Sequence, residues 1–204
     1  MRRIRTAVHT AVHIALTIGV LAIVGETALA QTTAMTPSPS VAKRPPQPAR
    51  TLLDEALREA KTTNRGVLTK FGASWCGPCH QLDAFVADTT GVGAIMAAHF
   101  VVVSLTVLES PAKVALENPG ASELGQQYGW NTVSSGVPFF FMLSSAGKKL
   151  GDSNGMPNGG NIGYPETVAE VEAFNTLLTT TAPRMSAAER ARIRQFLDRA
   201  AGRR

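Results

Sequence analysis

The chain of 204 residues contains only two cysteines, and both lie in the segment Trp75-Cys76-Gly77-Pro78-Cys79-His80. A fold held together by several disulfides is therefore excluded. The apolar run 67–71, which precedes this segment, predicts a buried strand. Cys79, Leu82 and Val86 then recur at helical spacing. The two thiols are thus expected where a strand leads into a helix, close enough together to act as a pair.

Their order along the chain predicts different roles for the two thiols. The N-terminus of a helix favours an anion, because its N–H groups are unpaired and the helix dipole is positive there. The first thiol, Cys76, is therefore expected to be exposed and partly ionised near neutral pH. Cys79 lies one turn further along, on the face that packs. An attacking thiol and a shielded resolving thiol are what thiol-disulfide exchange requires.

Two motifs together resemble those of the thioredoxin family. Trp75 to Cys79, after an apolar strand, resembles its active site, and Gly136-Val137-Pro138 before the apolar run 139–143 resembles its second signature, a cis-proline that opens a central strand. The similarity covers roughly residues 51–178. It is closest to the small secreted thioredoxin-like proteins, whose active-site helix continues with a Leu-Asp pair, here Leu82-Asp83.

This resemblance implies an α/β, thioredoxin-like fold with a central mixed β-sheet flanked by helices. The residues beyond it predict an extra C-terminal helix. It implies that Cys76 is the nucleophile and Cys79 the resolving thiol, and that Val137 and Pro138 contact the substrate. No metal and no cofactor are expected. The other residues implied as neighbours in the active site are Trp75, Gly77, Pro78 and Lys70.

Lys70 departs from the family pattern. Thioredoxins carry a buried aspartate six residues before the first cysteine, where it accepts a proton from the resolving thiol, and this chain has lysine at that position. A buried lysine would stabilise a thiolate but could not accept a proton while charged. Alternatively, the side chain extends to the surface, and water or another group takes the proton.

The N-terminal region predicts export. Three arginines precede an apolar run at 11–25, and Ala28-Leu29-Ala30 is a small-x-small site, so residues 1–30 are predicted to be a signal peptide cleaved after Ala30. An uncleaved membrane anchor is the alternative, although the run is shorter than the roughly 20 residues that span a bilayer. The mature protein is then periplasmic if the chain is bacterial. Residues 31–50 contain five prolines and predict a disordered linker.

The folded domain is expected at 51–182, followed by an Arg-rich helical extension at 183–204. A Ser186/Glu189 capping box should start the extension, and its arginines should share one face. Docking on the domain is favoured over binding to an acidic partner or a membrane surface. Residues 31–183 contain 10 Lys and Arg against 12 Asp and Glu, a net charge of −2, so no nucleic-acid partner is expected.

Within the domain, Thr51 is expected to cap the first helix and the strand at 100–105 to be buried on both faces. The helix at 166–180 should bury one stripe, formed by Val168, Val171, Phe174 and Leu178. The segment 151–165, with five glycines and three asparagines, predicts a mobile surface loop rather than a phosphate-binding loop. We hypothesise that this loop borders the active-site groove and contributes to substrate choice.

These features predict a thiol-disulfide oxidoreductase that reduces protein disulfides outside the cytoplasm. The Gly-Pro pair between the cysteines resembles that of reducing thioredoxins, which suggests resupply by a membrane electron carrier. A disulfide oxidase or isomerase with the same cysteines is one alternative, and a non-catalytic binding or chaperone module is another. Zinc binding by Cys76, Cys79 and His80 is disfavoured, because zinc sites usually need four ligands.

Overall fold

A mixed sheet of four strands forms the centre of the domain. The computed structural model describes residues 45–131 and 135–202, so the predicted signal peptide lies outside the described residues. The strand order is β2-β1-β3-β4, with β1 parallel to β2 and antiparallel to β3, and with β3 antiparallel to β4. The strands are β1 (Gly66–Gly72), β2 (Phe100–Thr106), β3 (Phe139–Leu143) and β4 (Lys149–Asp152). Strands β3 and β4 form a β-hairpin whose turn contains Gly147.

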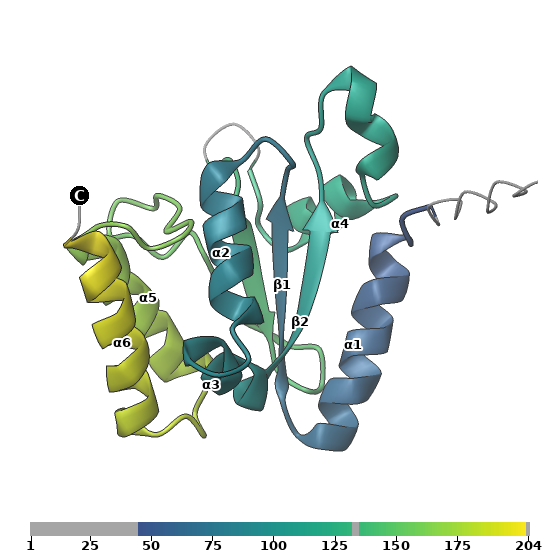
Figure 1. The fold of residues 1–204 in the computed structure, drawn as a ribbon. Coiled ribbons are helices and arrows are strands. Elements are labelled where there is room, and N and C mark those ends of the chain that lie inside the picture. The colour runs from purple at the N-terminus through teal and green to yellow at the C-terminus, as the bar shows by residue number, and fades with distance from the viewer. Residues whose placement is uncertain (1–44, 132–134, 203–204) are drawn as a thin grey trace, which may run out of the picture. The chain divides into compact units, whose positions relative to one another are not determined.

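Helices lie on both faces of this sheet, and Figure 1 shows α1 and α2 on opposite sides of β1. Among the described residues, no helix is long and apolar enough to cross a membrane. The helices are α1 (Ala49–Thr63), α2 (Gly77–Ala87), α3 (Val92–His99), the short 3-10 helix η1 (Pro111–Leu116), α4 (Ala121–Gln127), α5 (Val168–Thr181) and α6 (Ala187–Ala201). This arrangement confirms the predicted thioredoxin-like fold with an additional C-terminal helix.

The alternation of side chains along β1 divides the core into two clusters. Val67 and Phe71 pack with α1 and α4 on one face, whereas Leu68 packs with α2, α3, α5 and α6 on the other. Lys70 follows Leu68 by two residues and therefore points toward the α2 side. Gly72, two residues further on, faces the same side. The period of the strand thus directs a charged side chain and a glycine toward the helix that carries the cysteines.

Two local expectations were wrong. The first helix begins at Ala49, two residues before Thr51, and Pro48 occupies its N-cap position. Val168 is 72% exposed, because α5 starts there with a Thr167 capping box and its buried stripe begins only at Val171. Strand β2 is buried on both faces along its apolar run, as expected, since Phe100 and Val102 pack in one cluster and Val101, Val103 and Leu105 in the other; Ser104 is exposed.

Helix α6 docks on the domain, as the favoured alternative predicted. Its capping box is present, with Ser186 accepting from the N–H of Glu189, and Ile193 and Leu197 are buried against the α2–α5 side of the core. The imidazole of His99, at the end of α3, lies 3.3 Å from the Glu189 carboxylate. Hydrogen bonds from the backbone and hydroxyl of Ser186, together with His99, lower the pKa of Glu189 to about 2. The extension is therefore attached through both apolar and polar contacts.

Candidate active site

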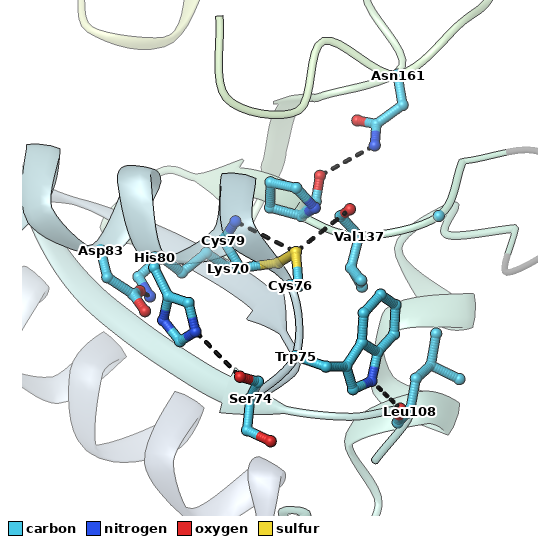
Figure 2. Close-up of a disulfide and its surroundings, with 12 residues drawn as sticks. Lys70, Ser74, Trp75, Cys76, Cys79, His80, Asp83, Leu108, Val137 and Asn161 are labelled. Atoms are coloured by element: carbon cyan, nitrogen blue, oxygen red, sulfur yellow. Dashed lines mark hydrogen bonds and ion pairs between the residues drawn. A yellow bond between two sulfur atoms is a disulfide. The ribbon is translucent and has the colours of Figure 1, made fainter. Parts of the chain in front are cut away.

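The cysteine pair lies at the N-terminus of α2, and the two sulfurs are joined in a disulfide (Figure 2). Cys76 is the N-cap residue, with extended backbone angles, and its Sγ accepts a hydrogen bond from the N–H of Cys79 at 3.2 Å. Pro78 lies in the first turn, where its missing N–H removes no helical hydrogen bond. The helix N-terminus thus supplies an N–H donor to the first sulfur, as the sequence predicted.

Exposure does not distinguish the two sulfurs, and the expectation of an exposed Cys76 was wrong. Cys76 is 3% exposed and Cys79 is 4% exposed. Ala73 and the half-buried Val137 pack against the pair and cover it. What differs is the surroundings: Cys76 Sγ lies 3.7 Å from the carbonyl oxygen of Val137, whereas Cys79 packs close to Gly72 and lines a cavity behind the disulfide.

The peptide bond between Val137 and Pro138 is cis, which confirms the expected cis-proline. It lies immediately before β3, the strand that pairs with β1. Since β1 leads directly into the cysteine segment, pairing of these two strands brings two motifs about 60 residues apart in the sequence to one place. Figure 2 shows the Val137 carbonyl directed at Cys76 Sγ.

Lys70 is buried, at 7% exposure, and does not extend to the surface. Its ammonium forms an ion pair with the carboxylate of Asp83 in α2, whose side chain is half exposed. Burial lowers the pKa of Lys70 to about 8, because a charged amine is poorly solvated there. The ion pair with the half-exposed carboxylate does not outweigh this effect, so the pKa is lowered overall.

Asp83 was quoted in the sequence only as part of a Leu-Asp pair, and its role as the partner of Lys70 was missed. A signal was present in the spacing. Asp83 follows Cys79 by four residues, so both side chains lie on one face of α2. Lys70 and Gly72 lie on the face of β1 that meets this helix. Together, the two periodicities bring a lysine, a carboxylate and the second thiol near one another.

A cavity of about 450 Å³ opens behind Cys79. It extends over the C-terminal ends of β1 and β2 and is also lined by the exposed Ser104, which pairs with Lys70 across the two strands. Among its lining residues are Lys70, Cys79, His80, Asp83, Glu109 and Pro138. The ion pair and the second sulfur therefore share one solvent-accessible space.

The segment after β2 forms hydrogen bonds with the active-site loop, and no motif in the sequence indicated this contact. The carboxylate of Glu109 accepts hydrogen bonds from the N–H and the hydroxyl of Ser74, at 2.5 and 2.7 Å. The indole N–H of Trp75 donates to the carbonyl of Leu108 at 2.8 Å, while its ring stays 61% exposed. Burial raises the pKa of Glu109, but the bonds from Ser74 and the charge of Lys113 outweigh it and lower the pKa overall.

His80 is exposed on α2, and its Nε2 lies 3.1 Å from the carbonyl oxygen of Ser74. Within residues 45–131 and 135–202, no group of three or more His, Cys, Asp or Glu side chains is placed to hold a metal ion. The geometry therefore gives no support to the alternative of zinc binding by Cys76, Cys79 and His80.

Replacing Lys70 by Met is expected to change the pH dependence of stability. Below pH 8 Lys70 is protonated in both the folded and the unfolded protein. Burial of this charge then lowers the stability of the folded state. Between about pH 8 and 10.5 the unfolded state binds more protons, so the free energy of unfolding should rise with pH. From pH 7.5 to 9.5 this rise should be about 2 kcal/mol, and Lys70→Met should abolish it.

Urea unfolding of the oxidised protein at these two pH values measures the effect, because the disulfide keeps the thiols from titrating. Lys148→Met is the matched control, since Lys148 is exposed. Its profile should parallel that of the wild type. If the free energy of unfolding changed with pH in the same way for the wild type and for Lys70→Met, the pKa of Lys70 would not be lowered by folding.

Comparison with known proteins places the domain in a family. A family model described as thioredoxin-like matches residues 49–145, which include the cysteine segment and the cis-proline. No curated protein matches the sequence significantly.

Solved structures also match the chain. One is a disulphide isomerase from Xylella fastidiosa Temecula1, with 25% identity over 80% of this chain and 95% of that one, and a TM-score of 0.43. A thioredoxin from Thermus thermophilus is 28% identical over 52% of this chain and 71% of its own, with a TM-score of 0.36. The DsbH oxidoreductase is 18% identical over 71% and 92%, with a TM-score of 0.42.

Proposed function

Because residues 49–145 make this chain a member of the thioredoxin-like family, we propose that it is a thiol-disulfide oxidoreductase that reduces protein disulfides through Cys76 and Cys79. One observation carries the proposal: the disulfide between these cysteines, whose first sulfur accepts the Cys79 N–H at 3.2 Å and lies 3.7 Å from the Val137 carbonyl. A reactive sulfur, a donor that stabilises its anion and a backbone that can pair with a polypeptide thus occur together.

The reaction begins with the reduced pair. The thiolate of Cys76 attacks one sulfur of the substrate disulfide, and the bond between the two substrate sulfurs breaks as one leaves as a thiolate. Cys79 then loses its proton and attacks Cys76 Sγ. The second substrate thiolate leaves, and the disulfide between Cys76 and Cys79 forms. Two electrons have passed to the substrate. The helix N-terminus favours Cys76 as the first nucleophile, because its sulfur is the one that accepts an N–H bond.

Lys70 and Asp83 handle the proton of Cys79 in this proposal. The three residues line one cavity, and Asp83 lies on the same face of α2 as Cys79. The carboxylate can accept a proton directly or through water in the cavity. Lys70 sets how readily it does so, since a charged ammonium beside Asp83 favours the ionised carboxylate. The carboxylate that thioredoxins carry on the strand is thus replaced by one on the helix.

We further propose that the protein works outside the cytoplasm. The support is the signal-peptide pattern of residues 1–30, which the structure does not describe. In that compartment, a reductase needs electrons from elsewhere, and a membrane electron carrier that reduces the disulfide between Cys76 and Cys79 would supply them. Binding of the α6 arginines to an acidic partner also stays a prediction. In the structure, Arg194 pairs with Glu172 of α5.

Trapping of mixed disulfides tests the order of the two thiols. Replacing Cys79 by Ala removes the resolving thiol, so Cys76 should remain bonded to substrate proteins and accumulate in adducts that dithiothreitol releases. Non-reducing electrophoresis with mass spectrometry identifies these adducts. The matched control is Cys76→Ala, which keeps only Cys79, the cysteine that does not occupy the N-cap of α2, and should trap at least about tenfold less. Equal trapping by both variants would contradict the assigned order.

A second candidate, disulfide oxidation or isomerisation with the same cysteines, differs in redox poise. A reductase of the proposed kind should have a reduction potential near the value of about −270 mV found for thioredoxin. An isomerase or oxidase should lie nearer −180 or −120 mV, values typical of those classes. Equilibration with glutathione or dithiothreitol buffers measures this potential. A value above about −200 mV would contradict reduction as the physiological direction.

A further inference from the structure

The glycine- and asparagine-rich loop that follows β4 is joined to the backbone of the cis-proline segment through the side chain of Asn161. Its Nδ2 donates to the carbonyl oxygen of Pro138 at 2.9 Å and to that of Ser135 at 2.5 Å. Its Oδ1 accepts from the N–H of Gly163 at 3.1 Å. Both ends of the amide are therefore used, and two backbone carbonyls that flank Val137 are held by one side chain. Figure 2 shows Asn161 directed at the Pro138 carbonyl.

Asn161 can fix these carbonyls because it is fixed itself. The next residue, Ile162, is 1% exposed in the core, and its N–H donates to the carbonyl of Ser153 at 2.6 Å. A second asparagine adds to the attachment. Asn154 accepts from the hydroxyl of Ser135 at 2.8 Å and donates to the carbonyl of Gly129 at 3.0 Å. The loop is thus tied to the core at one point and to the cis-proline segment at several.

The segment held in this way is the one that a polypeptide substrate would have to contact. Val137 lies between the two carbonyls bound by Asn161, and its own carbonyl faces Cys76 Sγ. An extended chain that pairs with Val137 gains from a backbone already fixed in place, since less conformational entropy is lost on binding. A small disulfide needs only access to the sulfur of Cys76. The backbone fixed by the loop should therefore speed the reduction of disulfides in extended polypeptides and leave that of small disulfides unchanged.

We propose that Asn161 is a positioning residue that makes the site selective for disulfides carried on extended polypeptides over small-molecule disulfides. This inference rests on the proposed function and names the substrate class of the same site. Asn161 acts through the backbone of Val137 and Pro138 and takes no part in the sulfur chemistry. The two hydrogen bonds that its amide donates are the interaction that selects the substrate.

Single-turnover reduction by the dithiothreitol-reduced full chain tests this assignment. Second-order rate constants are measured for insulin and for 2-hydroxyethyl disulfide. Asn161→Ala should lower the rate constant for insulin about tenfold and change that for the small disulfide less than about twofold. Asn161→Asp keeps the shape and the acceptor for Gly163 but removes both donors, so it should show the same selective loss. It also replaces the alanine variant if that one does not fold.

Asn158→Ala is the matched control. Asn158 lies in the same loop and is exposed, and among the residues that the structure describes it accepts only from the N–H of Gly160, so both rate constants should stay at the wild-type values. An equal loss on both substrates in the Asn161 variants would assign the residue a general structural role and overturn the inference. An unchanged rate constant for insulin would also overturn it. If the wild type reduces neither substrate, the proposed function fails instead.

Discussion

The close approach of Gly72, at the end of β1, to Cys79, in the first turn of α2, is the contact on which the site depends. A Cβ atom at position 72 would lie 3.1 Å from Cys79 Cβ and 3.3 Å from its sulfur, so a larger residue would push the helix away from the strand. With glycine there, the helix begins directly over the sheet. Cys76 becomes its N-cap, and the Val137 carbonyl, brought alongside by the pairing of β3 with β1, lies 3.7 Å from its sulfur.

Strand β1 and helix α2, which form this contact, also bring two charged side chains together. The alternation of β1 directs Lys70 to the α2 side, and the helical spacing from Cys79 brings Asp83 to meet it. A buried lysine lowers stability at neutral pH, a cost that an apolar side chain of similar volume would avoid. Lys70 lines the same cavity as Cys79, so its charge lies near the second thiol. The chain thus has a lysine and a helix carboxylate beside the second cysteine, where the thioredoxin pattern has a single strand carboxylate.

Much of the fold was predictable because it depends on local periodicity. The apolar runs gave β1, β2 and β3, the Ser186/Glu189 spacing gave the start of α6, and the two motifs gave the cysteines and the cis-proline. What could not be predicted depends on side chains far apart in the sequence. Glu109 binds Ser74 across 35 residues, and Asn161 binds Pro138 across 23. Neither contact leaves a pattern in its own segment. The burial of Cys76 was missed for the same reason, since Val137 covers it.

Cys76 is proposed to be the nucleophile because of its place at the helix N-terminus, although both cysteines are almost equally buried in the disulfide form. Alkylation of the reduced protein tests this proposal most directly. The protein is treated at pH 7 with a limiting amount of iodoacetamide, and the modified residue is located by peptide mapping. The helix N-terminus predicts that Cys76 reacts first and that Cys79 stays largely unmodified. Preferential modification of Cys79, or equal modification of both, would contradict the account.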